Sequence, residues 1–183
     1  MKFTRLEIPE VILCEPKILS DDRGYFSETF REDKLEKFLR FPINFCQENE
    51  SKSSFGVLRG LHYQIAPYEQ SKLVRVLQGA VLDVSVDLRK DSPTFGKHIA
   101  IELSEENKKQ ILIPKGFAHA FVALEDSTIF QYKVDNYYSG VNDGGVIWND
   151  EELAITWPEL QLELSEKDRN LPKLNQLNLN TLW

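Results

Sequence analysis

Short runs of alternating apolar and polar residues recur along most of this chain, which is the pattern of β-strands. Apolar residues occupy alternate positions in 74–76 and in 82–86, and Gln78-Gly79 lies between these runs. A glycine between two strand-like runs indicates a hairpin, so we expect these two strands to pair. The second strand has one apolar face and one polar face, the latter formed by Asp83, Ser85 and Asp87. Further strands are expected at His98–Leu103, Lys109–Ile113, Ala118–Ala123 and Ser127–Asp135, and a turn at Ser92–Gly96.

Helical periodicity is sparse. Residues Glu32–Leu39 carry apolar side chains at helical spacing, which predicts a short amphipathic helix. Near the C-terminus, Ser165 suits the N-cap of a second helix, with Asp168 at its third position. Many short strands with little helix predict an all-β sandwich or barrel. A length of 183 residues predicts a single domain over residues 1–183.

The composition narrows the range of partners. Hydrophobic residues make up 42% of the chain and charged residues 28%, as in a globular protein. The net charge is −7, which disfavours nucleic acid as a partner because binding its backbone needs an excess of Lys and Arg. A single anionic substrate stays possible, provided that arginines gather into a local basic pocket.

Cysteines and apolar runs suggest a cellular location. Cys14 and Cys46 have no metal-binding spacing and form a poor disulfide framework, so we interpret both as small buried hydrophobes in a reducing compartment. Charged residues interrupt the first thirteen positions, so neither a signal peptide nor a membrane span is expected. We therefore expect a cytoplasmic protein without a membrane partner.

His62 is one of three histidines, and a single histidine is more often structural than catalytic. It lies in the segment Arg59–Gln64, on an expected strand, where Arg59 and His62 would point to opposite faces. Gly60 between them could form a bulge that turns both side chains toward one pocket. The competing interpretation is an exposed arginine beside a core histidine.

His119 follows the spacing Pro114-x-Gly116-x-x-His119, which resembles the second motif of the cupin superfamily. Many cupins bind a metal, and their first motif contains a His-x-His pair. Here the corresponding segment is His62-Tyr63-Gln64, so the second histidine is missing. The sequence offers no other evident set of three or four ligands, so we expect no metal.

The order and spacing of several longer segments are similar to those of the dTDP-4-dehydrorhamnose 3,5-epimerase family. The similarity runs from about Asp22 to Pro172 and rests on Asp22–Glu28, Gly56–Gln64, Lys72–Val76, Asp83–Arg89, Ser92–Gly96, Ile113–Phe121 and Tyr132-Lys133. The resemblance implies a cupin-like jelly-roll β-barrel or sandwich with a few short helices. It also implies a homodimer that needs no cofactor and acts on a nucleoside-diphosphate 4-keto-6-deoxy-hexose, inverting C3 and C5 beside the C4 ketone.

The resemblance also assigns four catalytic residues. His62 matches the base that removes the α-proton, and Asp168 matches the carboxylate paired with it. Tyr132 matches the acid that returns a proton on the opposite face, and Lys72 matches the cation near the enolate oxygen. Without the resemblance, other interpretations are equally good. Asp168 could be an acidic residue at the start of a helix, Tyr132 a core aromatic residue and Lys72 a surface lysine.

Substrate-binding residues carry over in the same way. Arg23 and Arg59 match pyrophosphate ligands, which would supply the local basic pocket. His119 is expected to line the sugar pocket, and Asp83 is expected near the site as a supporting group that does not contact the substrate. In this family the N-terminal strands exchange across the dimer, so the partner subunit would supply part of the set. The other positions around the nucleotide and sugar are Phe26, Glu28, Gln47, Asn49 and Tyr138.

Some positions depart from the family pattern: Glu48, Ser71, Ala120, Gly140 and Asp143. The last two lie in a loop near the nucleotide and sugar, so the substrate is less certain than the chemistry. Inversion at C3 alone or C5 alone, or a GDP-linked substrate, therefore stays open. Two other classes also stay open, a metal-dependent cupin oxygenase and a sugar-nucleotide-binding protein without catalysis.

Overall fold

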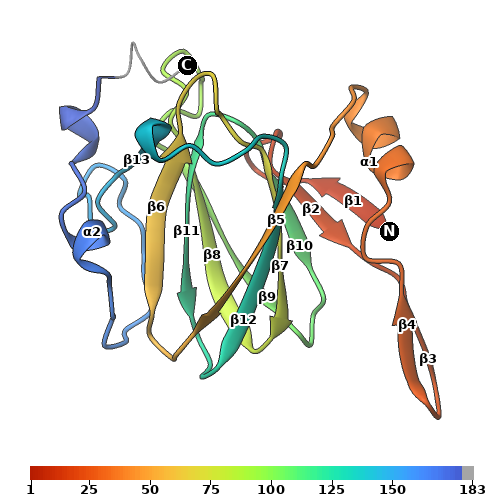
Figure 1. Cartoon of the computed structure of the whole chain (residues 1–183). Coiled ribbons are helices and arrows are strands. Elements are labelled where there is room, and N and C mark those ends of the chain that lie inside the picture. Colours follow the sequence, from red (N-terminus) through yellow and green to blue (C-terminus); the bar gives the residue numbers. More distant parts are fainter. Residues whose placement is uncertain (179–183) are drawn as a thin grey trace.

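The computed structural model describes residues 1–178, and β-strands dominate it (Figure 1). The strands are β1 (Lys2–Arg5), β2 (Ile12–Glu15), β3 (Ile18–Asp21), β4 (Gly24–Ser27), β5 (Gln47–Ser53), β6 (Leu58–Gln64), β7 (Lys72–Gln78), β8 (Ala80–Asp87), β9 (His98–Ser104), β10 (Gln110–Ile113), β11 (Phe117–Ala123), β12 (Thr128–Val134) and β13 (Asp143–Gly145). The α-helices are α1 (Glu32–Leu39) and α2 (Glu166–Arg169), and the 3₁₀ turns are η1 (Gly140–Asn142) and η2 (Leu174–Gln176).

Two antiparallel sheets form the body of the molecule. One has the strand order β1-β2-β10-β7-β12-β5, and the other has the order β13-β6-β11-β8-β9. Apolar side chains of both sheets meet between them, among them Val74, Phe121 and Phe130, and each of these is at most 5% exposed. The all-β architecture expected from the alternating pattern is therefore confirmed, and so is the predicted helix α1.

The predicted hairpin at Gln78-Gly79 is wrong. Strand β7 pairs with β10 and β12, whereas β8 pairs with β9 and β11 in the other sheet. Gly79 has φ +76° and lies so close to Thr128 that an added Cβ would be 2.5 Å from its Oγ1 atom. Alternation identifies a strand but not its partner, and here the tight turn carries the chain from one sheet to the other.

Strand β8 is buried on both faces. Its apolar face, with Val84 and Val86, packs beneath the C-terminal segment that contributes Leu153 and Leu174. Its polar face, with Asp83, Ser85 and Asp87, is also completely buried. Buried carboxylates need hydrogen-bonded partners, so this strand places reactive groups inside the molecule.

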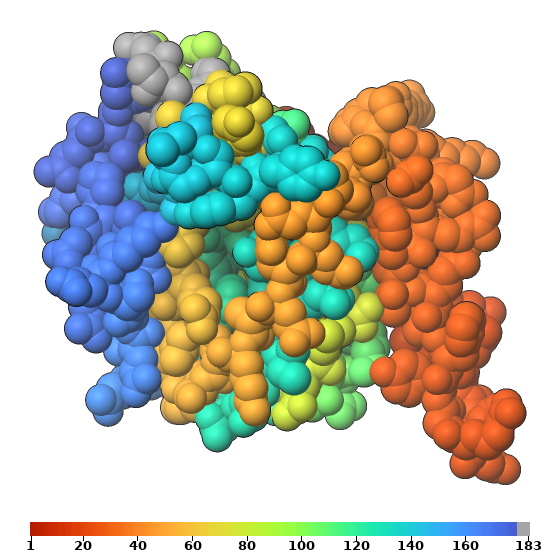
Figure 2. Space-filling model, in the orientation of Figure 1, coloured from red at the N-terminus to blue at the C-terminus, as the bar shows by residue number. Residues whose placement is uncertain are grey.

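The molecule is open along one side. Strand β5 ends one sheet, and β6 lies next to the short β13 at the end of the other. Figure 2 shows the surface hollowed between the segments of β5 and β6. The two-stranded β3–β4 hairpin projects away from both sheets (Figure 1). Within residues 1–178, no helix is long and apolar enough to span a membrane.

The two cysteines are both free thiols. Cys14 is 2% exposed, as expected, and burial raises the pKa of its thiol to about 12. Cys46 is half-buried, so its interpretation as a buried residue is wrong. Its thiol donates to the carbonyl oxygen of Val134 at 3.7 Å, at the start of the β5 edge.

Candidate active site

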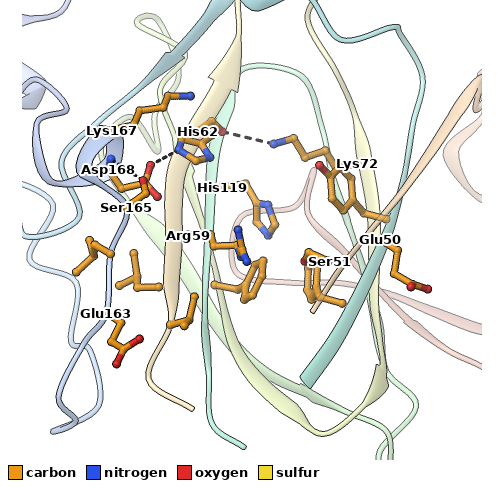
Figure 3. A pocket seen from close by; sticks show the side chains of 16 residues that line it. Glu50, Ser51, Arg59, His62, Lys72, His119, Glu163, Ser165, Lys167 and Asp168 are labelled. Atoms are coloured by element: carbon orange, nitrogen blue, oxygen red, sulfur yellow. Dashed lines mark hydrogen bonds and ion pairs between the residues drawn. The ribbon is translucent and has the colours of Figure 1, made fainter. Parts of the chain in front are cut away.

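The hollow between β5 and β6 leads into a cavity of about 530 Å³ (Figure 3). Strands of both sheets and the C-terminal segment around α2 contribute its walls. The lining residues that bear on the chemistry are Ser51, Arg59, His62, Lys72, His119, Phe121, Phe130, Tyr132, Lys167 and Asp168. The cavity therefore brings together six residues that the sequence predicted for the site: Arg59, His62, Lys72, His119, Tyr132 and Asp168.

His62 and Asp168 form a hydrogen-bonded pair, with 2.6 Å between Nε2 and Oδ1. The His62 side chain is 30% exposed, whereas that of Asp168 is 5% exposed. Burial raises the pKa of Asp168, but hydrogen bonds from His62, Ser165 and the Gly60 N–H outweigh burial and leave the pKa below its usual value. Asp168 is thus a carboxylate that can hold the imidazole by one nitrogen and leave Nδ1 for the cavity.

The predicted cap of α2 helps to place Asp168. The Ser165 hydroxyl accepts a hydrogen bond from the Asp168 N–H at 3.1 Å, as expected for an N-cap. This cap begins a helix of four residues, Glu166–Arg169. The helix-start role and the contact with His62 therefore coexist in one residue.

The predicted bulge at Gly60 is confirmed. His62 pairs with His119 and Arg59 pairs with Phe121, so β6 has one more residue than β11 between these pairs. Gly60 has φ +126°, and a Cβ added there would lie 2.5 Å from the Cβ of Ala120. The bulge removes the parity conflict, and both Arg59 and His62 line the cavity.

Lys72 and Tyr132 face the cavity from the opposite sheet. Lys72 Nζ donates to the His62 carbonyl oxygen at 3.5 Å (Figure 3). Burial lowers the pKa of Lys72 to about 8, although Asp143 and Asp83 act in the opposite direction. Burial also raises the pKa of Tyr132, and this effect is larger than the lowering by its hydrogen bond with Asn49. Near neutral pH, Lys72 is therefore a cation and Tyr132 a protonated acid.

His119 belongs to a second histidine–aspartate pair. Its Nε2 lies 2.8 Å from Oδ2 of Asp83, and the two side chains are 8% and 0% exposed. Burial lowers the pKa of His119, against the opposing effect of Asp83. Asp83, which was expected near the site, thus contacts His119 directly.

Gln47, Asn49 and Tyr138 are not among the residues that line this cavity, but they contact one another beside Tyr132. The Gln47 side chain donates to Asn49 Oδ1 at 2.8 Å and accepts from the Tyr138 N–H at 3.2 Å. The Tyr138 ring is 57% exposed. These three residues are therefore close to Tyr132, which pairs with Asn49 across β5 and β12.

Arg23, Phe26 and Glu28 lie away from this cavity. Arg23 and Phe26 belong to the projecting β3–β4 hairpin, where Arg23 is paired with Asp21 at 2.5 Å and Phe26 is 68% exposed. Glu28 follows the hairpin and contacts Lys34 at 2.6 Å. Within one chain, these expected ligands are not brought to the site.

The structure adds residues that the sequence did not single out. Lys167 precedes Asp168 and lines the cavity, and Phe121 stacks on Phe130 in its wall with ring centroids 4.2 Å apart. The adjacency of Lys167 to Asp168 was the available signal. Among residues 1–178, no group of three or more His, Cys, Asp or Glu side chains is arranged to hold a metal ion.

One cavity in this β-barrel is lined by a group that can take up a proton and, on the opposite sheet, by a group that can return one. This arrangement is typical of an isomerase that works by acid–base chemistry. The chain belongs to the dTDP-4-dehydrorhamnose 3,5-epimerase family, whose model matches residues 5–176.

Individual relatives extend this result. The dTDP-4-dehydrorhamnose 3,5-epimerase of Escherichia coli K12 is 49% identical over 178 residues, covering 97% of this chain and 96% of that protein. The 3,5-epimerase of Legionella pneumophila in complex with dTDP-4-keto-L-rhamnose is 44% identical, with a TM-score of 0.95 over 99% of this chain and 96% of that one. A 3′-monoepimerase of Streptomyces bikiniensis in complex with dTDP-quinovose is 33% identical, with a TM-score of 0.89 over 93% of this chain and 86% of that one. These likenesses confirm the cupin-like jelly-roll fold.

Proposed function

We propose that this enzyme epimerises a dTDP-linked 4-keto-6-deoxy-hexose at C3 and C5, converting dTDP-4-dehydro-6-deoxy-glucose to dTDP-4-dehydrorhamnose. The observation that carries the proposal is that the His62–Asp168 pair, Tyr132 and Lys72 share one cavity. The relatives named as 3,5-epimerases support the substrate and both carbons.

We infer the proton transfers from the positions of these groups. His62 Nδ1 removes the proton from the carbon beside the ketone, and the Asp168 carboxylate stabilises the imidazolium that forms. The Lys72 ammonium stabilises the negative charge on the enolate oxygen. The Tyr132 hydroxyl, on the other sheet, then delivers a proton to the opposite face of the carbon. Exchange with solvent returns both groups to their starting states, so no cofactor is required.

The diphosphate and base of the substrate need positive charge and an aromatic surface. Arg59 lines the cavity and can bind the diphosphate. In one chain, the projecting hairpin exposes Arg23 and Phe26 to solvent. This exposure supports a role for both side chains in binding to another chain. We propose a homodimer in which the hairpin of each subunit completes the site of its partner. The free thiols support a reducing, cytoplasmic location.

The reaction is tested by incubation with dTDP-4-keto-6-deoxy-glucose in D₂O, followed by NMR and mass spectrometry. The proposal expects deuterium at both C3 and C5. Deuterium at one carbon would instead identify a single-site epimerase. If deuterium entered a GDP-linked analogue and not the dTDP sugar, the nucleotide assignment would be wrong.

The shared site is tested by mixing two inactive variants, His62→Ala and Arg23→Ala. In a mixed dimer, one site carries both defects and the other carries neither. Random exchange of subunits should restore activity to roughly a quarter of the sites. No recovery after exchange, with mixed dimers verified by mass spectrometry, would show that the hairpin does not serve the partner's site.

A further inference from the structure

Asp143 is the centre of a group of contacts beside the catalytic cavity. Its Oδ2 atom contacts Lys167 Nζ and accepts a hydrogen bond from the Tyr138 hydroxyl at 3.3 Å. Its Oδ1 atom accepts from Gln64 Nε2 at 3.2 Å. The Asp143 side chain is 13% exposed, so most of it is shielded from water. Both carboxylate oxygens are thus engaged, by residues from three different parts of the chain.

These contacts continue across the open side of the barrel. On one side they end at Lys167, which is the residue before Asp168 in α2. On the other side, the Tyr138 N–H donates to Gln47, which donates to Asn49, the hydrogen-bonding partner of Tyr132. A chain of polar contacts therefore joins α2, which contains the Asp168 partner of His62, to β12, which contains Tyr132. Asp143 is the carboxylate in this chain.

The same residues surround a smaller chamber of about 190 Å³ next to the main cavity. Asp143, Gln64 and Tyr138 line this chamber together with His62, Lys72, Tyr132 and Lys167. His62, Lys72, Tyr132 and Lys167 also line the main cavity. Asp143 therefore lines the chamber beside the reacting groups, and its own contacts are with Gln64, Tyr138 and Lys167.

We propose that Asp143 is a positioning residue. Through its ion pair with Lys167 it holds α2 against the open side of the barrel, and α2 in turn keeps Asp168 and His62 opposite Tyr132. The proposal rests on the proposed epimerase function of this site. The helix α2 has four residues, too few to be stable alone, so side-chain contacts with the barrel must fix it. The contacts from α2 residues to the barrel on which the geometry depends are Lys167 with Asp143 and Asp168 with His62.

The charge of Asp143 also acts on the groups around it. Burial lowers the pKa of Lys72 to about 8, and Asp143 together with Asp83 opposes that fall. Burial raises the pKa of Tyr132, and Asp143 adds to this rise. The other titratable groups that face this region are His62, Tyr63, Tyr138 and Lys167. Removal of the Asp143 charge should therefore lower the pKa of both Lys72 and Tyr132.

The test is Asp143→Asn, which keeps the shape and removes the charge. We expect kcat to fall by about tenfold, because small displacements of reacting groups are costly, while KM changes by less than about threefold. The alkaline limb of the pH–rate profile should move to lower pH. Asp143→Glu, which restores the charge, should recover much of kcat and return the limb. Asp91→Asn, at an exposed position just before the Ser92–Gly96 turn, is the matched control and should change neither quantity.

Two kinetic outcomes and one spectroscopic outcome would overturn the proposal. An increase in KM alone, with kcat and the pH profile unchanged, would make Asp143 a substrate ligand and not a positioning residue. Unchanged kinetics in Asp143→Asn would remove any role. A measurement without substrate tests the positioning role independently of the proposed function. The His62 Nε2–H proton is observed by ¹⁵N-edited NMR. It should exchange with water faster in Asp143→Asn and in Lys167→Met than in the wild type. Unchanged exchange would contradict the positioning role even if the wild type proved inactive on the dTDP sugar.

Discussion

The two histidine–aspartate pairs of this protein have nearly the same contact and different surroundings. The separations are 2.6 Å for His62 and Asp168 and 2.8 Å for His119 and Asp83. The His62 side chain is 30% exposed at the open side of the barrel, whereas the His119 side chain is 8% exposed. Asp83 comes from the buried polar face of β8, and Asp168 from a short helix on the outer layer.

The difference shows that contact alone does not make a general base. A base must accept a proton from the substrate and later release it to water, which a partly exposed ring can do. Burial lowers the pKa of His119, so the neutral ring is favoured, and Asp83 holds this ring by a hydrogen bond. We therefore propose proton abstraction for the first pair and support of the sugar pocket for the second.

The strongest test of this assignment is His62→Ala. Loss of a general base typically costs about 10²–10⁴-fold in rate, so solvent deuterium should stop entering both C3 and C5. His98→Ala, which changes the third histidine outside the cavity, is the control and should retain exchange. Exchange near the wild-type rate in His62→Ala would mean that another group is the base.

A comparison of the two carboxylates comes next. Asp168→Asn should lower kcat by about 10²-fold or more, because the amide no longer stabilises the imidazolium or selects its tautomer. Asp83→Asn should have a clearly smaller effect on kcat. The two variants are compared by steady-state kinetics at saturating substrate. Equal losses would contradict the division of labour between the pairs.

The free energy of unfolding should depend more on the buried His119–Asp83 pair than on the His62–Asp168 pair, which is the reverse of the order expected for activity. His119→Ala leaves the fully buried Asp83 carboxylate without its partner, which should cost about 3 kcal/mol of unfolding free energy. His62→Ala removes a partly exposed ring and should cost less. Urea unfolding followed by circular dichroism measures both values. A larger loss in His62→Ala would show that burial does not separate the two pairs.

The smallest effect is expected in the pH dependence. Lys72 donates to the His62 carbonyl, and Asp83 of the second pair acts on its charge. Because the ammonium stabilises the enolate and its pKa is about 8, kcat should be retained below that pH and fall as the pH rises through it. Lys72→Arg, which stays charged, should lose this limb. An identical limb in Lys72→Arg would assign the titration to another group.

Local patterns predicted those features that depend on residues close together in the sequence. Alternation marked the strands, the spacing of apolar residues marked α1, and Ser165 marked the start of α2. The bulge at Gly60 could be predicted because the parity of Arg59 and His62 and the missing Cβ are properties of one segment. The family resemblance then selected His62, Tyr132, Lys72 and Asp168 from many candidates.

Only the tertiary structure decided which distant segments meet. Strands β7 and β8 look like a hairpin, yet the turn at Gly79 sends them to different sheets, because pairing depends on the whole sheet and not on the turn alone. Asp168 reaches His62 from 106 positions away, and Asp143 joins two sides of the opening by contacts that no local pattern contains. The sequence by itself thus determined the strands and the kinds of reactive group. Folding decided which histidine stays near solvent and which is buried, because exposure depends on how the sheets and the C-terminal segment pack.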